Sequence, residues 1–572
     1  MFPAHFAGMI ARTPMFAHLD DAQRDALTQH LCWLCLPGGQ SLFRPGEPSD
    51  ALYLLCSGSL GVFDGPTVRV HQVVAGECVG ELGLLSRRPH RYTLRALRDS
   101  ELLRLDRAAF ESLLEHHPGP MLGVARHAVE RLLYPDRRNV ATDRPRTFAI
   151  LPVDADTPAR PLAARLVQAL APYGSCALID AATAAGHGVD WFAEREAAMR
   201  FVIYLDDRGD PAWRQRCLRQ ADVLLLPARA ECSAHPWPEA TPGHPSRARH
   251  RPRHLLLLHP GQHVTAGAAR RWLAQFSGEL QHHHICNDDD VARMARLVSG
   301  HGRGLVLSGG GARGLAHLGA VRALREAGYR FDAVGGTSIG AIVGAGVALH
   351  WDTETMMDRY HEAFVRGRPV SDWTLPLVAL TRGGRASAIL RRAFGEIDIE
   401  DMRHPFFCVS TNLTREGRAV HRRGPLWQWL RASSAIPGIL PPVLHHGDVY
   451  VDGALVDNLP TDVMADDGIA HITAVSIRAD VRMRTRLDAS TTPPWWNLLA
   501  HRHDERDWPW LVPTLTRAAM INSEEISAGC HALADLLITP LLEHTGLLDW
   551  KDWSHAVDAG YREAQRVLAG TR

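Results

Sequence analysis

Ser338 is the residue of this sequence whose surroundings best suit a reactive side chain. It lies in Gly336-Thr337-Ser338-Ile339-Gly340, a G-x-S-x-G pattern that is typical of a nucleophilic serine on a sharp strand-to-helix turn. The glycines on either side of such a serine leave room for neighbouring segments of the chain. The pattern is short, so its meaning depends on the motifs that accompany it.

A glycine-rich turn precedes this serine and follows a predicted buried strand at 304–308. It reads Gly309-Gly310-Gly311-Ala312-Arg313-Gly314, and its backbone N–H groups could form an oxyanion hole. The same glycines also fit the G-x-G-x-x-G fingerprint of dinucleotide-binding folds, which requires an acidic residue at the end of the next strand. Asp332 precedes that strand instead of ending it. A phosphate-binding P-loop is excluded because no Lys-Ser or Lys-Thr follows the glycines.

A base for the serine is predicted downstream, in Val451-Asp452-Gly453-Ala454. The Asp452 carboxylate could accept the serine proton directly if it lay within hydrogen-bond reach in a poorly solvated pocket. Asp-Gly is also a common turn dipeptide, which is the structural alternative for Asp452. A histidine base remains open as well, with His317, His445 and His446 as the candidates.

Together these motifs resemble those of the patatin-like phospholipase family, as does the segment 431–438 (RASSAIPG) followed by Pro441-Pro442. Members of that family use a Ser–Asp dyad. The resemblance implies that Ser338 is the nucleophile, that Asp452 is the base, and that amides of the 309–314 turn bind the oxyanion. It gives Arg313 a role in stabilising the turn and near the substrate phosphate. It implies no metal and no organic cofactor.

These side chains need a folded scaffold to position them. The 572 residues are enough for three or four domains, and we expect a multidomain α/β protein. Residues 302–480 are predicted to form a patatin-like α/β/α hydrolase domain, and residues 481–572 its C-terminal helical extension. Within that extension Trp495 and Trp496 suit a membrane–water boundary. The alternative is that both rings pack helices onto the hydrolase domain.

Residues 13–135 are predicted to form an N-terminal β-roll with flanking helices, because short apolar runs alternate there with Gly and Pro turns. The segment from Gly80-Glu81 to Arg91 and Thr93 resembles the phosphate cassette of cyclic-nucleotide-binding domains. In that family the glutamate holds the ribose and the arginine binds the cyclic phosphate. Tyr92 departs from the pattern, since a small residue usually follows the arginine. The domain could therefore bind a nucleotide or serve only for packing or partner contacts.

Residues 145–298 contain continuous apolar runs separated by helical segments, which predicts a parallel sheet buried on both faces. No phosphate loop or catalytic cluster occurs in this central region. The run 282–284 (HHH) near Cys286 is interpreted as a polar loop or strand end. Cys32 and Cys35 are expected in the core rather than at a zinc ion.

Composition narrows the class of protein. The 572 residues carry no formal net charge, so nothing in the charge indicates nucleic acid as a partner. No apolar run reaches the ~18 residues of a membrane-spanning helix, and the ten cysteines are expected to be reduced thiols. We expect a cytoplasmic protein that binds peripherally at the inner face of the membrane.

The order of the three predicted domains resembles that of neuropathy target esterase and its bacterial relatives. This resemblance implies an acyl hydrolase that cleaves fatty-acyl esters of lysophospholipids or phospholipids and is regulated by a cyclic nucleotide. Two alternatives remain open. One is a cyclic-nucleotide-responsive signalling module with an inactive hydrolase domain. The other is a hydrolase of soluble esters or protein thioesters.

Overall fold

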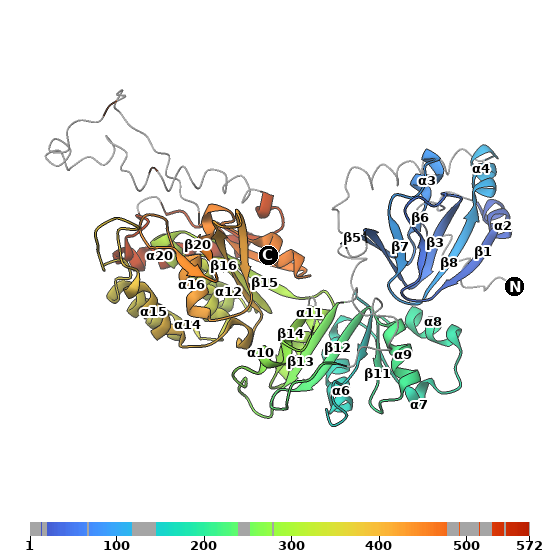
Figure 1. The fold of residues 1–572 in the computed structure, drawn as a ribbon, viewed down its shortest axis with the longest axis horizontal. Coiled ribbons are helices and arrows are strands. Elements are labelled where there is room, and N and C mark those ends of the chain that lie inside the picture. The colour runs from blue at the N-terminus through green and yellow to red at the C-terminus, as the bar shows by residue number, and fades with distance from the viewer. Residues whose placement is uncertain are drawn as a thin grey trace. The chain divides into compact units, whose positions relative to one another are not determined.

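The computed structural model describes residues 13, 16, 20–65, 68–116, 145–237, 252–276, 280–477, 491, 514, 529–542 and 545–570. Contacts divide the chain into two compact units, residues 1–258 with 272–295 and residues 259–271 with 296–572 (Figure 1). Trp495 and Trp496 lie outside the described residues. In the part of the chain that is described, no helix combines the length and the apolar character that a membrane span requires.

The first unit begins with the predicted β-roll, which is confirmed. Two antiparallel four-stranded sheets have the orders β1-β8-β3-β6 and β2-β7-β4-β5. Cys32 and Cys35 are exposed on β1, so the expectation that they lie in the core is wrong. The elements are α2 Asp21–Gln29, β1 Leu31–Leu36, β2 Ser41–Phe43, β3 Ala51–Ser57, β4 Ser59–Asp64, β5 Val68–Val74, β6 Cys78–Val79, α3 Glu81–Ser86, β7 Thr93–Ala96, β8 Ser100–Asp106 and α4 Arg107–His116.

The central region has the predicted parallel sheet, with the strand order β10-β11-β9-β12-β13-β14. His282, His283 and His284 lie inside β14, not in a loop, and the last two are buried. The His254 and His283 rings share a hydrogen bond of 2.9 Å, which explains how a polar run fits a buried strand. The elements are β9 Thr147–Ile150, α6 Ala159–Leu170, β10 Cys176–Asp180, α7 Ala181–Ala184, α8 Val189–Ala198, β11 Phe201–Leu205, α9 Pro211–Gln220, β12 Val223–Arg229, β13 Arg253–Leu258, α10 Ala268–Leu273, β14 Gln281–Ile285 and α11 Asp288–Val298.

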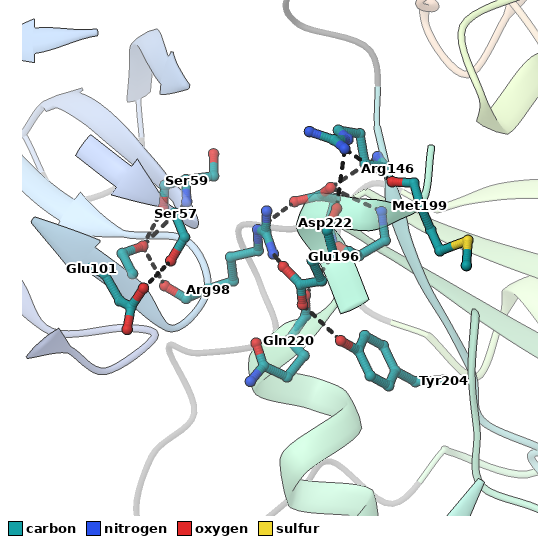
Figure 2. A network of polar contacts seen from close by, with 12 residues as sticks. Ser57, Ser59, Arg98, Glu101, Arg146, Glu196, Met199, Tyr204, Gln220 and Asp222 are labelled. Atoms are coloured by element: carbon teal, nitrogen blue, oxygen red, sulfur yellow. Dashed lines mark hydrogen bonds and ion pairs between the residues drawn. The ribbon is translucent and has the colours of Figure 1, made fainter. Parts of the chain in front are cut away.

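Arg98 joins the β-roll to the central sheet within this first unit. From the turn between β7 and β8 its guanidinium reaches Glu196 Oε2 at 2.6 Å and Asp222 Oδ1 at 2.9 Å (Figure 2). Tyr204 Oη donates to the other oxygen of Glu196 at 2.6 Å. The three charged side chains are nearly buried, so the network ties two sheets together by charge pairs that water screens little.

The second unit is built on an eight-stranded mixed sheet with the order β19-β20-β17-β16-β15-β21-β22, and β18 pairs with β17. Pairs among β17, β16, β15, β21 and β22 are parallel, whereas β18 and β20 run antiparallel to β17. The strands are β15 Arg303–Leu307, β16 Ala333–Thr337, β17 Phe406–Asn412, β18 Gly417–His421, β19 Val443–His445, β20 Asp448–Asp452, β21 His471–Val475 and β22 Leu536–Ile538.

Alternate residues of this sheet face two separate apolar cores. On β15, Leu305 and Leu307 belong to one core and Val306 to the other, as the two-residue period of a strand requires. Helices cover both faces, which confirms the α/β/α hydrolase fold. The helices are α12 Ala316–Glu326, α13 Ile339–Ala348, α14 Thr353–Tyr360, a π-helical segment η3 His361–Arg366, α15 Gly384–Phe394, α16 Leu426–Ser433, α17 Thr461–Asp466 and α20 Trp553–Gly570.

The C-terminal segment is part of this unit and includes a strand, β22, as well as helix α20. The backbones of α12 and α20 approach each other through Gly319 and Gly560, where an added Cβ would clash with a carbonyl of the facing helix. Such close approach requires glycine at both positions. Helix α20 is thereby held against the helix that follows the glycine turn.

Candidate active site

Ser338 lies on the turn between β16 and α13, at the carboxyl end of a buried parallel strand. Its φ of 55° is in the left-handed region, which a non-glycine residue occupies only under strain. A Cβ on Gly336 would lie 2.6 Å from the carbonyl oxygen of Leu307, and one on Gly340 would also collide with that oxygen. The two glycines of the motif therefore let the turn lie against β15.

Asp452 ends β20 and meets Ser338 across the sheet. Ser338 Oγ donates a hydrogen bond to Asp452 Oδ2 at 2.8 Å, and both side chains are buried. Strand β20 is held in register by β17, where Asp452 lies opposite Ser410. The sheet thus brings together two residues that are 114 positions apart in the sequence.

The Asp452 carboxyl is oriented by its surroundings. Its Oδ1 accepts the N–H of Ala454 at 2.9 Å, which occupies the oxygen that does not face Ser338. Burial raises the pKa of Asp452 from 3.8 to about 6, against the opposing effect of the hydrogen bonds from Ala454 and Ser338. A carboxylate with a raised pKa is a stronger proton acceptor than one in water.

Ser433 supports the strained turn, a role that the sequence did not reveal. Its Oγ accepts the backbone N–H of Ser338 at 2.8 Å and donates to the carbonyl of Val409 at 2.6 Å. Ser433 belongs to the segment 431–438, which carries part of the family resemblance but was given no role in the sequence analysis. No residue pattern identifies this role, because both partners of the Ser433 hydroxyl are backbone atoms. The neighbouring Ala435 contributes in the same way, since its carbonyl accepts the N–H of Asp452.

The glycine turn 309–314 lies beside Ser338, at the end of the neighbouring strand β15. Within it, the N–H of Gly309 is bonded to Asn458 O and that of Ala312 to Leu547 O. The amides of Gly310 and Gly311 make no hydrogen bond to any described residue. Of the amides predicted as oxyanion donors, Gly309 and Ala312 are therefore already engaged by the fold.

Arg313 anchors this turn to the C-terminal segment. It is buried, and its Nε donates to Thr545 O at 2.6 Å. Burial lowers the pKa of its guanidinium. The predicted stabilisation of the turn agrees with this contact, whereas a role near the substrate phosphate stays a prediction.

The histidines proposed as alternative bases are engaged elsewhere. The His317 ring bonds to Ser308 O at 2.8 Å, and burial lowers its pKa to about 4. His445 bonds to Gln428 at 3.0 Å, and the His446 ring packs on that of His445. Among the described side chains, it is Asp452 that accepts the hydrogen bond of the Ser338 hydroxyl.

A cavity opens at Ser338, and its lining is almost entirely apolar. Apart from Ser338, Ser434 is the one lining residue with a hydroxyl group. The lining residues are Gly311, Ser338, Ile339, Ile342, Phe364, Pro369, Val370, Ala386, Ile389, Leu390, Ser434, Ile436, Leu440, Leu548 and Trp550.

The predicted cyclic-nucleotide residues lie around α3 of the β-roll. Gly80 precedes the helix with φ +97°, and Glu81 is its first residue and is buried. Arg91 is exposed, with its guanidinium over the Tyr92 ring. Thr93 begins β7 and is half-buried. Arg91 thus has no acidic partner among the described contacts. It lies instead over the ring of Tyr92, the residue that departs from the usual cassette pattern.

In the described residues, three side chains approach each other closely enough to suggest a metal site, Asp457, Asp462 and Cys530. Arg418 Nη1 donates to both carboxylates at 2.6 Å. The arginine supplies the positive charge there, so we assign this cluster to an ion pair.

Comparison with known proteins gives three family matches along the chain. Residues 34–117 match the cyclic nucleotide-binding domain, residues 144–301 the P-loop-like domain of the Neuropathy Target Esterase (NTE) family, and residues 305–465 the patatin-like phospholipases. An NTE family protein of Mycobacterium tuberculosis is 32% identical over 98% of this chain and 96% of its own length. The chain belongs to the NTE family.

Fungal NTE proteins are similar over much of this chain but are longer. Lysophospholipase NTE1 of Mycosarcoma maydis is 30% identical over 85% of this chain and 30% of its own length. Lysophospholipase nte1 of Aspergillus fumigatus is 28% identical over 94% of this chain and 42% of its own length. The chain therefore spans less than half of these fungal relatives. The matches confirm the patatin-like class of carboxylic ester hydrolase and the cyclic-nucleotide-binding fold.

Proposed function

We propose that this NTE family member is a serine acyl hydrolase that removes the fatty acyl chain from lysophospholipids, with Ser338 as nucleophile and Asp452 as base. The observation that carries the proposal is the 2.8 Å hydrogen bond from Ser338 Oγ to Asp452 Oδ2. The fungal relatives are named lysophospholipases, which supports the substrate class.

In the first step Asp452 accepts the hydroxyl proton while Ser338 Oγ attacks the ester carbonyl carbon. The tetrahedral intermediate collapses, the glycerol oxygen leaves with the proton from Asp452, and an acyl-enzyme remains. Water then attacks the acyl carbon and gives its proton to Asp452, and Ser338 recovers that proton as the fatty acid leaves. The raised pKa of Asp452 suits both proton transfers, since its ordinary value would make it a weak acceptor.

Gly310 and Gly311 are the proposed oxyanion donors. Their amides lie between the engaged amides of Gly309 and Ala312, and Gly311 lines the same cavity as Ser338. Fixed N–H donors of this kind typically lower an acyl-transfer barrier by about 3–4 kcal/mol each. The C-terminal residues Thr545 and Leu547 hold the turn that presents them.

The cavity supports a fatty acyl chain as the group that enters it. Side chains such as Ile342, Leu390 and Leu440 line it beside Ser338, and burying an alkyl chain there gains about 0.8 kcal/mol per methylene. A short soluble ester would leave much of this apolar surface unused.

A fluorophosphonate probe and a lipid panel test the proposal. The wild type should be labelled and Ser338→Ala should not, because the probe reacts with an activated serine. Lysophosphatidylcholine should release fatty acid faster than a short soluble ester. Absence of labelling would favour the inactive signalling module, and labelling with hydrolysis of soluble esters or thioesters alone would favour the other alternative.

We further propose that a cyclic nucleotide binds the β-roll through Glu81 and Arg91 and regulates hydrolysis. The exposed guanidinium of Arg91 supports phosphate binding, because arginine offers a fork of donors. Calorimetry with cyclic AMP and cyclic GMP should detect binding that Arg91→Ala abolishes and that Arg87→Ala, on the same loop, retains. No heat with either nucleotide would leave the β-roll as a packing or partner-binding domain.

A further inference from the structure

Residues 372–382 form a projecting segment before α15, here called the tongue. Its two limbs are joined by an antiparallel bridge between Trp373 and Thr381 and by a 3.0 Å hydrogen bond from Thr374 N to Leu380 O. Its root is fixed where Leu380 N donates to Gly438 O and Thr381 Oγ1 donates to Ile439 O. The tongue is therefore a hairpin with a defined base.

The tongue exposes large apolar side chains from its first limb, at Trp373, to its tip. Trp373 is 64% exposed, Leu375 73%, Leu377 85% and Val378 72%. These are four of the eleven exposed large apolar side chains in the described part of the chain, within six consecutive positions. Single exposed apolar residues are ordinary, whereas a contiguous cluster indicates a binding surface.

The tongue adjoins the cavity that contains Ser338. Pro369 and Val370, just before it, line that cavity, and so does Ala386, just after it. The root also bonds to the backbone between Ile436 and Leu440, which are lining residues too. A lipid that reached the tongue would therefore be next to the cavity.

Positive charge lies at the base of the tongue. Arg368, Arg382 and Arg385 are exposed on either side of it. The single acidic residue, Asp372, accepts the backbone N–H of Arg385 at 3.0 Å and is half-buried. This arrangement suits a lipid–water interface. The apolar side chains would enter the acyl region, the tryptophan would lie at the boundary, and the arginines would meet anionic head groups.

We propose that the tongue docks this protein on a lipid surface and inserts its tip among the acyl chains beside the Ser338 cavity. The inference rests on the proposed function, because it takes the substrate to be a lipid held in that surface. A protein partner would be expected to meet a polar rim with satisfied hydrogen bonds. The tongue instead offers four exposed aliphatic or aromatic side chains, with the three arginines at its base.

Vesicle sedimentation tests the docking surface without any hydrolysis. In a Ser338→Ala background, Leu375→Ser with Leu377→Ser should weaken binding to phosphatidylcholine–phosphatidylglycerol vesicles by about tenfold or more, because each leucine loses its transfer to an apolar medium. Leu541→Ser is the matched control, since Leu541 is also 73% exposed but lies outside the tongue. It should bind as the parent does, and all variants should share one melting temperature.

Activity separates this inference from the proposed function. With Ser338 intact, the double tongue variant should hydrolyse a short soluble ester at the parental rate but lose rate on lysophospholipid presented in vesicles. If no ester is hydrolysed, the proposed function fails while the sedimentation result still decides the role of the tongue. Parental vesicle binding by the tongue variant would overturn the inference. So would loss of self-association in that variant with unchanged vesicle binding, because the tongue would then be a protein contact.

Discussion

The backbone N–H of Ser338 donates to the side-chain oxygen of Ser433 at 2.8 Å, and the hydroxyl of Ser433 donates a hydrogen bond to Val409 O at 2.6 Å. One serine thus ties the strained turn at Ser338 to strand β17. Strand β17 also fixes β20, which ends at Asp452. The same strand therefore positions both halves of the proposed dyad.

Ser433→Ala should lower kcat by about tenfold or more and leave KM nearly unchanged. The variant leaves the buried N–H of Ser338 without a partner, which costs about 1–3 kcal/mol and loosens the turn. Steady-state kinetics on a soluble ester would measure it. Ser387→Ala is the control, because that half-buried hydroxyl donates to Gly383 O at 3.0 Å and does not line the cavity. Equal kinetics for both variants would remove Ser433 from the positioning of Ser338.

Ser338→Ala and Asp452→Asn should each abolish ester hydrolysis with the fold intact, since neither changes the volume of the core. The double variant should lose little more than either single variant, because residues that act as a unit are not additive. Near-normal turnover of Asp452→Asn, together with loss of turnover in His445→Ala or His446→Ala, would show that the base is a histidine.

The chemistry of the site was predictable from sequence where motifs carry side chains in a fixed order. Ser338 and Asp452 stood in such motifs, and the structure brings them into contact. Ser433 was not predicted because its partner is a backbone N–H 95 positions away. The support of the glycine turn by Thr545 and Leu547 was also invisible, since carbonyl oxygens leave no signature in residue type.

The fold was predictable where apolar runs are continuous. The predicted strand at 304–308 is β15, Arg303–Leu307, and the apolar runs of the central region form the parallel strands β9, β11, β12 and β13. The prediction of a loop or strand end at 282–284 was wrong, because the hydrogen bond between His254 and His283 lets a buried strand contain imidazoles. Cys32 and Cys35 failed for the opposite reason, since an apolar sequence in an edge strand can still face solvent.

The rate of hydrolysis should rise with pH through about 6, the value to which burial raises the pKa of Asp452, and level off above it. Only the ionised carboxylate accepts the Ser338 proton. A pH profile of kcat/KM on a soluble ester measures this. Asp457→Asn is the control, because burial also raises the pKa of Asp457 to about 6. This variant should keep the rise of kcat/KM with pH. A wild-type profile that is flat from about pH 5 to about pH 7, roughly one unit to either side of this pKa, would contradict the assignment of Asp452 as the base.

The raised pKa of Asp452 affects stability in the opposite direction from the rate: stability falls as pH rises. The folded state holds the Asp452 proton more tightly than the unfolded chain, whose carboxyl has a pKa near 3.8. The resulting stabilisation is present below that value and is lost as pH rises through about 6. At neutral pH, Asp452→Asn should therefore be more stable than the wild type by roughly 1–3 kcal/mol. Denaturant unfolding at pH 4 and 7 should show the difference growing with pH, and an unchanged difference would exclude a raised pKa.

Arg98→Ala should destabilise the first unit by roughly 3–5 kcal/mol, because Glu196 and Asp222 would remain nearly buried without a counter-charge. The variant should also separate unfolding of the β-roll from that of the central sheet, since Arg98 connects them. Calorimetric scans would detect the additional transition. Arg165→Ala breaks the exposed pair with Asp288 in the same unit and should cost at most about 1 kcal/mol. Equal melting temperatures for the two variants would mean that the Arg98 network does not couple the β-roll to the central sheet.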